Sequence, residues 1–228
     1  MAKAFVSWSG GKDSCLAYYR ALQKGMDVCL LFNMATEDGT RSRSHGLSKE
    51  VLNMQAQAVG LPLVQSQATW TDYEAEFEKA LLALRETGIT DGVFGDIDLD
   101  EHRQWVEQVC HRCGIKPHLP LWGDNQDSLL REFLDAGFRA IIIVTRADMM
   151  GEGWLGRELD SAFIADLEAC GNITPCGEAG EYHTLVIDGP SFNKSLMITE
   201  AEKMLRGDHW FMDIKKAALC QAGKDRPE

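Results

Sequence analysis

Hydrophobic and polar positions alternate in two rhythms along this chain. Short apolar runs predict strands, and segments with apolar residues every three or four positions predict amphipathic helices. In the first half the predicted strands are Ala4–Trp8, Val28–Met34, Leu63–Ser66 and Gly92–Ile97, and the predicted helices are Ser14–Lys24, Ser48–Val59, Tyr73–Thr87 and Glu101–Cys113. This alternation predicts an α/β fold, a Rossmann-like parallel sheet with helices on both faces.

The pattern changes at Lys116–Asp124, where two prolines and a glycine interrupt it. We place a domain boundary there, between residues 1–122 and residues 123–228. The later part predicts the helices Gln126–Ala136 and Arg157–Ala169 and the strands Arg139–Thr145, Tyr182–Ile187, Lys194–Leu205 and His209–Leu219. Arg206–Asp208 is typical of a hairpin turn between the last two strands. The second domain is therefore expected to be smaller and α+β.

The turn between the first predicted strand and helix reads Ser-Gly-Gly-Lys-Asp-Ser at residues 9–14. Adjacent glycines let the backbone approach an anion closely, and the first amides of a helix have no partner inside the helix. The turn therefore predicts a phosphate-binding loop, to which Lys12 adds a positive charge and Ser9 and Ser14 add hydroxyl donors. A Walker A loop is excluded, because it needs four residues between its glycines and a Ser or Thr after the lysine.

Composition narrows the class of protein. The 228 residues are 45% hydrophobic, enough for a sizeable core, and their formal net charge is −12. An acidic chain without a basic patch argues against nucleic acid as a direct partner. The apolar runs are too short to span a membrane, the first strand leaves no room for a signal peptide, and the seven cysteines are odd in number. We expect a reduced, cytoplasmic protein.

Cys110 and Cys113 form a Cys-x-x-Cys pair that invites a zinc or redox interpretation. A structural zinc site needs four ligands, and no second close pair occurs in the sequence. The two cysteines continue the apolar face of Trp105 and Val109, so packing is the favoured interpretation.

A second dense cluster, Cys176–Thr184, reads Cys-Gly-Glu-Ala-Gly-Glu-Tyr-His-Thr. Two carboxylates, Glu178 and Glu181, lie three residues apart around a glycine. In the extended segment that follows, Tyr182 and Thr184 share one face and His183 takes the other.

These motifs together resemble a known family. Residues 9–14 resemble the pyrophosphate loop of the N-type ATP pyrophosphatases, whose fold is adenine nucleotide alpha hydrolase-like. With Gly95–Ile97, Leu119–Trp122, Trp154–Arg157 and residues 176–184 in this order, the whole chain resembles the diphthine–ammonia ligase family. The family implies that ATP and ammonium convert the carboxylate of diphthine, on elongation factor 2, to an amide, with release of AMP and pyrophosphate.

Two positions depart from the family pattern, in which the second motif reads Glu-Gly-Gly-Glu, then Tyr or Phe, then Glu. Ala179 replaces a glycine and His183 replaces an acid. The change to Ala179 is mild because alanine is small. His183 resembles the variant in a bacterial-type branch of the family that is proposed to act in cobalamin salvage, so a cobalamin precursor or another small acid is an alternative acceptor.

The resemblance, together with the residue types, gives a set of expected site residues. Catalytic roles are expected for Lys12, Asp13, Glu178, Glu181 and His183. ATP is expected to contact Ser7, Trp8, Ser9, Gly10, Gly11, Lys12, Asp13, Ser14, Asn33, Met34, His45, Gly95 and Asp96. The acceptor is expected to contact Trp122, Glu178, Glu181, Tyr182, His183 and Thr184. Mg²⁺ is expected on Asp13, with help from Asp96, because hard cations prefer oxygen ligands.

His183 is further expected to be the base that deprotonates ammonium. A pyrophosphate-loop enzyme that thiolates tRNA through a Cys-x-x-Cys pair is a rival interpretation, and an ATP-binding sensor without turnover is another. We expect no membrane partner, and we allow for a homodimer.

Overall fold

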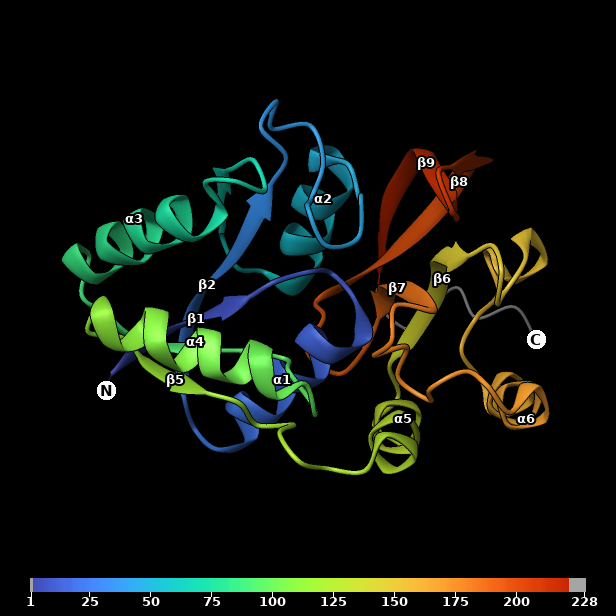
Figure 1. Ribbon diagram of the computed structural model, residues 1–228, viewed down its shortest axis with the longest axis horizontal. Helices are drawn as coiled ribbons and strands as arrows, with labels where there is room; N and C mark the ends of the chain where they lie inside the picture. Colours follow the sequence, from blue (N-terminus) through green and yellow to red (C-terminus); the bar gives the residue numbers. More distant parts are fainter. Residues whose placement is uncertain (1, 222–228) are drawn as a thin grey trace. The chain divides into compact units, whose positions relative to one another are not determined.

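The computed structural model describes residues 2–221 and contains two separate β-sheets with flanking helices (Figure 1). The helices are α1 Lys12–Gln23, α2 Lys49–Val59, α3 Tyr73–Glu86, α4 Asp100–Arg112, α5 Gln126–Asp135 and α6 Ser161–Cys170, with a short 3-10 helix, η1, at Glu152–Trp154. The strands are β1 Lys3–Ser7, β2 Asp27–Ala35, β3 Leu63–Gln67, β4 Ile89–Val93, β5 Lys116–His118, β6 Arg139–Arg146, β7 Tyr182–Asp188, β8 Lys194–Arg206 and β9 His209–Gln221.

The first sheet is parallel and has the strand order β3-β2-β1-β4-β5. Phe5 of the central strand β1 is in register with Leu30 of β2 and Gly92 of β4. The chain therefore winds outward from β1 in both directions, as in doubly wound α/β sheets. The predicted fold class is confirmed.

Helices α3 and α4 cover one face of this sheet around an aromatic cluster. The ring centroids of Phe5 and Phe32 are 5.8 Å apart in edge-to-face geometry, and those of Phe5 and Phe94 have the same spacing. The two helices contribute the residues Phe77, Ala80, Leu81, Leu84, Val106, Val109 and Cys110. Ala4 and Val6 alternate with Phe5 and are also fully buried, so both faces of β1 are covered.

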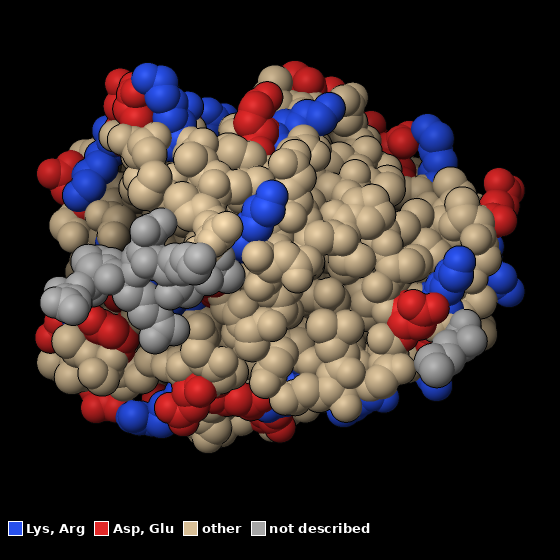
Figure 2. Space-filling model, turned by 180° about the vertical axis from the view of Figure 1, so that it is seen from behind, with Lys and Arg blue, Asp and Glu red and all other residues tan. Residues whose placement is uncertain are grey.

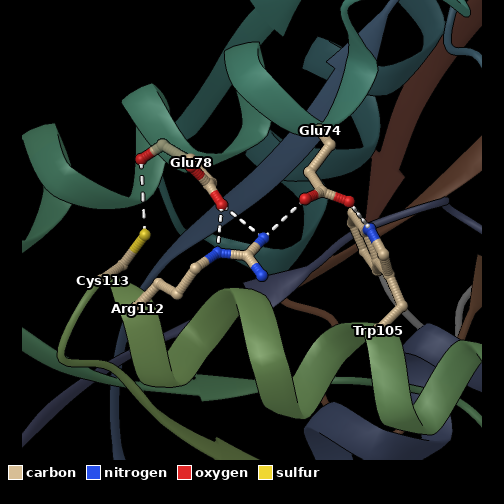
Figure 3. A network of polar contacts seen from close by, with 5 residues as sticks. All are labelled: Glu74, Glu78, Trp105, Arg112 and Cys113. Carbon is tan, nitrogen blue, oxygen red and sulfur yellow. Dashed lines mark hydrogen bonds and ion pairs between the residues drawn. The ribbon is translucent and has the colours of Figure 1, made fainter.

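A polar network joins the outer sides of α3 and α4 (Figure 3). Arg112 lies between Glu74 and Glu78, with its Nη2 2.6 Å from Glu74 Oε1 and its Nε donating to Glu78 Oε1 at 2.5 Å. Trp105 Nε1 donates to the second oxygen of Glu74 at 2.7 Å. These contacts link α3 to α4, although exposed ion pairs of this kind add little stability individually.

Cys110 and Cys113 are buried beneath that network and are not joined in a disulfide. Cys113 Sγ lies 3.7 Å from the carbonyl oxygen of Glu78. Burial, with the nearby Cys113 thiol, raises the pKa of Cys110 to about 12. Within residues 2–221 no group of three or more His, Cys, Asp or Glu side chains is arranged to hold a metal ion. The geometry supports packing for this pair.

The second sheet is antiparallel and has the order β7-β6-β9-β8. The long strands β8 and β9 form a hairpin in which Arg206 pairs with His209 across a two-residue turn. Gly207 in that turn has a φ of +60°, which a glycine adopts without strain. The predicted hairpin is confirmed.

The residues form two compact units that do not follow the chain continuously. Among the described residues, the first consists of residues 2–9, 13–49 and 61–123. The second consists of residues 10–12, 50–60 and 124–221. The last change of unit falls beside the expected boundary, but the central part of the glycine turn and most of α2 belong by their contacts to the second unit.

Two strands of the parallel sheet differ from the sequence expectation. β4 runs over Ile89–Val93 rather than Gly92–Ile97, because Asp91 is accommodated inside the sheet by His118, whose Nε2 is 2.6 Å from Asp91 Oδ1. β5 lies within residues 116–124, where the sequence pattern predicted a domain boundary but no strand. An edge strand tolerates Pro117, which lacks an amide hydrogen.

Helix α6 begins at Ser161 rather than at Arg157. The side chain of Asp160 accepts a hydrogen bond from Phe163 N at 2.7 Å and so caps the helix. Glu158 instead forms an isolated bridge with Ile141 of β6.

No helix within the described residues is both long and apolar enough to cross a lipid bilayer.

We expect a maleimide reagent to modify Cys170 in the native protein well before Cys110 and Cys113. Cys170 is exposed, whereas the other two thiols are buried and burial raises their pKa, so little thiolate is accessible. Peptide mass spectrometry over a labelling time course measures the three rates, and guanidinium-unfolded protein is the control in which all react. Native labelling of Cys110 as fast as Cys170 would contradict the packing interpretation.

Candidate functional site

The turn after β1 has the backbone that a phosphate loop requires. Gly10 has a φ of +83°, a left-handed conformation that a side chain would strain. Helix α1 begins at Lys12, so the amides that follow belong to its first turn and lack helical partners. Ser9 Oγ and Ser14 Oγ are 3.1 Å apart, which brings two hydroxyls to the same turn. The structure thus has the predicted order of elements: a strand, then a glycine turn, then the start of a helix.

The loop after β4 approaches the start of α1 within the first unit. A Cβ on Gly95 would lie 2.9 Å from the carbonyl carbon of Asp13 and 3.0 Å from Ser14 N. Both are backbone atoms, so a larger residue would have to displace the helix start. Asp96 follows, and its Oδ1 is 3.6 Å from His102 Nδ1. The carboxyl ends of β1 and β4 thus meet at one edge of the sheet, where ligands of such sheets bind.

Some residues expected to border ATP use their side chains to hold the sheet together. Asn33 Nδ2 donates to Trp8 O at 2.8 Å, and Asn33 Oδ1 accepts from Gln65 Nε2 at 3.0 Å. Trp8 is buried edge-to-face against Tyr18, and Met34 belongs to the aromatic core. These positions therefore offer a ligand their backbone rather than their side chains.

Ser7 and His45 are both half-buried. Ser7 ends β1, and His45 lies in the loop that connects β2 to α2.

Lys12 is a buried cation seated on the second motif, within the second unit. Its side chain is packed so that only 4% of the residue is exposed. Its amide donates to Thr184 Oγ1 at 3.0 Å, and its Nζ donates to the carbonyl oxygen of Cys176. The same Nζ lies 5.2 Å from the centroid of the Tyr182 ring. Lys12 is therefore in direct contact with the Cys176–Thr184 cluster, although Lys12 and Thr184 are 172 positions apart in the sequence.

Glu181 shapes the loop that precedes β7. Its Oε1 accepts from Thr174 N at 2.6 Å, and its Oε2 accepts from Thr174 Oγ1 and Ala179 N, each at 3.0 Å. Only 1% of Glu181 is exposed. A buried carboxylate with three donors is already well satisfied, so this side chain holds the loop rather than presenting a charge to a ligand.

Tyr182 and Thr184 are both buried and His183 between them is more exposed, as the alternation along an extended segment predicts. Tyr182 OH donates to Pro175 O at 2.5 Å, and its ring packs edge-to-face on Phe163. The ring of Tyr182, like the carboxylate of Glu181, is thus part of the support of the loop.

Of the expected acceptor contacts, Glu178, Trp122 and His183 remain at least partly exposed. Glu178 is half-buried in the turn between Gly177 and Gly180. Trp122 belongs to the first unit, where the guanidinium of Arg103 lies 5.0 Å from its ring centroid. Arg103 Nε also pairs with Glu107 Oε1 at 2.7 Å, one turn further along α4.

His183 is held in its neutral form. Burial lowers its pKa to about 4, and the positive charges of Lys12 and His209 act in the same direction, against the opposite effect of Glu181. A neutral imidazole can donate or accept a hydrogen bond, but at this pKa it holds a proton weakly. It is therefore a poor base near pH 7.

Three contributors to the site were missed from the sequence. Gln55 of α2 and Val186 of β7 contact Gly10, and Thr174 donates twice to Glu181. For Gln55 the sequence held one signal: it interrupts the apolar face formed by Val51, Leu52, Ala56 and Val59. A polar residue on a buried helix face indicates a specific hydrogen bond. Nothing in the local pattern marks Thr174 or Val186.

We expect His183→Gln to reduce the acid sensitivity of folding. In the folded protein the pKa of His183 is about 4, below the ordinary value of 6.5. Between these two pH values His183 is therefore protonated in the unfolded chain but neutral in the folded protein. This contribution to stability is complete above pH 6.5 and is lost as the pH falls toward 4; its full size is on the order of 3 kcal/mol. Urea unfolding at pH 7.5 and pH 5 should show a smaller loss of free energy in the variant than in the unmodified protein. Equal losses would contradict a depressed pKa.

The chain is similar to known proteins over most of its length. Residues 2–117 match the family model described as the diphthamide synthase N-terminal domain, and residues 125–220 match that of the diphthamide synthase C-terminal domain. The curated relatives include diphthine–ammonia ligases from Danio rerio, 28% identical over 90% of each chain, and from Homo sapiens, 26% identical over 90% of this chain and 86% of its own. The Schizosaccharomyces pombe enzyme of that name is 30% identical over 96% of this chain and 39% of its own length.

A solved structure from Methanocaldococcus jannaschii, titled a "predicted subunit of tRNA methyltransferase", has a TM-score of 0.47 and 15% identity over 82% of this chain and 97% of its own. At that score the likeness carries no weight. The two domain models, matched in order along a chain whose phosphate-type turn is seated on its second motif, decide the classification: the chain belongs to the diphthamide synthase family.

Proposed function

We propose that this chain is an ATP-dependent ligase that adenylates a carboxylate and joins it to ammonia, with diphthine on elongation factor 2 as the acceptor. The observation that carries the proposal is the seat of Lys12, whose amide and Nζ contact Thr184 and Cys176 of the second motif. The residue expected to meet the phosphates and the loop expected to meet the acceptor are thereby in contact. Family membership supports the same reaction class.

The chemistry explains why both motifs are needed. A carboxylate is a poor electrophile, so its oxygen first attacks the α-phosphorus of ATP, and the bond to the β-phosphate oxygen breaks to release pyrophosphate. Ammonia then attacks the acyl carbon, the bond to AMP breaks, and a proton leaves the new amide nitrogen. Positioning and charge stabilisation supply most of the catalysis in such transfers.

We assign phosphate binding to the glycine turn. The amides of Gly10 and Gly11 and the hydroxyls of Ser9 and Ser14 would receive the β- and γ-phosphates, and Lys12 would balance the charge on the departing pyrophosphate. The Nζ of Lys12 donates to the carbonyl oxygen of Cys176 and lies over the Tyr182 ring, so both contacts hold the cation within the turn.

Asp13 would hold Mg²⁺, with help from Asp96. Asp13 is in the first turn of α1, and Gly95 brings the Asp96 loop against its backbone. Carboxylate oxygens suit this hard cation, which in nucleotide sites takes one or two of them and completes its shell with phosphate oxygens and water. When bound, the ion would neutralise phosphate charge.

At the acceptor side we assign contact to Glu178 and His183 and loop support to Glu181 and Tyr182. A quaternary ammonium on the acceptor would be attracted to the Glu178 carboxylate. The Tyr182 ring already faces Lys12, which makes it unsuited to a second cation. His183 is assigned as a neutral hydrogen-bonding group rather than as the base, because burial depresses its pKa to about 4.

The rival functions have weaker support. On the face drawn in Figure 2, the described Lys and Arg side chains lie mainly around the rim, several beside Asp or Glu, and the middle of the face carries no basic patch. Thiolation of tRNA would also need a reactive Cys pair, whereas Cys110 and Cys113 are buried. A small acid remains the alternative acceptor because of His183. The homodimer and the cytoplasmic location stay predictions.

We expect the purified protein, given ATP, ammonium and diphthine-bearing elongation factor 2, to produce AMP and pyrophosphate in equal amounts with the amide. Nucleotide products are measured by chromatography and the acceptor by mass spectrometry, with ammonium omitted as the control. ADP and phosphate as products, or no turnover with this acceptor and with small acids, would contradict the proposal.

We expect Glu178→Gln to impair acceptor binding and Glu181→Gln to impair folding stability. Glu178→Gln should raise the KM for the acceptor roughly tenfold and leave the melting temperature nearly unchanged. Glu181→Gln should lower unfolding free energy by about 1–3 kcal/mol, because a charged acceptor of three buried hydrogen bonds is lost. Kinetics and urea unfolding of both variants measure this. The reverse pattern would show that the two roles are exchanged.

A further inference from the structure

Gln55 is a buried polar residue that the proposed mechanism does not use. It lies on α2, is 0% exposed, and is surrounded along the helix by Val51, Leu52, Ala56 and Val59. A primary amide in such a position destabilises the fold unless its hydrogen bonds are made. Its Nε2 donates to Gly10 O and to Val186 O, each at 2.8 Å.

The same carbonyl is also held by the strand. Val186 N donates to Gly10 O at 3.0 Å, and two residues earlier on β7 Thr184 Oγ1 accepts from Lys12 N at 3.0 Å. Thr184 and Val186 lie on one face of β7, since residues two apart in a strand point the same way. Gln55 therefore completes a clamp that holds both ends of the segment Gly10–Lys12.

The clamp determines where the next amide points. The Gly10 carbonyl and the Gly11 N–H belong to one planar trans peptide unit, in which the C=O and N–H bonds point in opposite directions. Fixing the Gly10 oxygen toward Gln55 and Val186 therefore fixes the Gly11 N–H toward the other side. The Gly10 φ of +83° is a conformation that glycine leaves easily, so the peptide would otherwise be free to rotate.

We infer that Gln55 is a positioning residue for the triphosphate: through the Gly10 carbonyl it orients the Gly11 amide that meets the β- and γ-phosphates. This inference rests on the proposed function. It assigns to α2 a part in nucleotide binding that neither sequence motif contains.

The test compares variants that change the donors and little else. Gln55→Met keeps the length of the side chain and removes both donors. The matched control is Asn193→Ala, which removes a different amide-to-carbonyl bond to the same helix, from Asn193 Nδ2 to Val59 O at 2.9 Å. Affinities for an ATP analogue that cannot be cleaved between its α- and β-phosphates, and for AMP, are measured by calorimetry together with the melting temperature.

We expect Gln55→Met to lower the affinity for the analogue by roughly tenfold and the affinity for AMP by less than twofold. The reason is that AMP lacks the β- and γ-phosphates that the turn would bind. Asn193→Ala should lower the melting temperature without changing either affinity. A Gln55→Met variant that binds both ligands like the unmodified protein, or that loses both equally, would overturn the inference.

Gln55→Glu gives a second readout that a purely structural role would not move. Its carboxyl can donate one hydrogen bond only when protonated, and its ionised form repels both carbonyl oxygens. Over the pH range in which circular dichroism shows the variant to be folded, its affinity for the analogue should therefore fall from pH 6 to pH 8.5 more steeply than that of the unmodified protein. An identical pH profile would overturn the inference. If the unmodified protein binds no analogue at all, the proposed function itself is contradicted, and the inference falls with it.

Discussion

The seat of the glycine turn on β7 is the constraint on which the rest of the site depends. Lys12 donates two hydrogen bonds, from its amide to Thr184 Oγ1 and from its Nζ to Cys176 O. The Gly10 carbonyl oxygen accepts two more, from Val186 N and from Gln55 Nε2. Each bond alone is a modest net contribution, of about 1 kcal/mol. Together they fix a turn that its glycines leave flexible, and preorganised donors are what stabilise developing charge.

This arrangement has a consequence for how the two motifs act. In a doubly wound sheet the ligand-binding edge is formed by loops of that sheet, and here the loop after β4 contributes Gly95 at the start of α1. The segment Gly10–Lys12 belongs to the second unit by its contacts, which include the bond from Lys12 N to Thr184 Oγ1. A change in the loop that Glu181 supports is therefore transmitted to Lys12 through the Cys176 carbonyl, and phosphate and acceptor binding are expected to be coupled.

Much of the fold could be predicted from the sequence because its signals are local. Hydrophobic period and glycine spacing fixed the helices, the central strands and the phosphate-type turn. β5 was missed because Pro117 disguises an edge strand, and β4 was displaced because the pairing of Asp91 with His118 is invisible in one dimension. The roles of Glu181 and Tyr182 depend on Thr174, Pro175 and Lys12, which are brought to them only by the fold.

The most direct test of this coupling is hydrogen–deuterium exchange of residues 174–186, with and without an ATP analogue that cannot be cleaved between its α- and β-phosphates. The account predicts that the analogue slows amide exchange in this segment as well as in residues 9–14, and that AMP has a much weaker effect on both. Protection confined to residues 9–14 and the edge of the parallel sheet, with residues 174–186 unchanged, would contradict it.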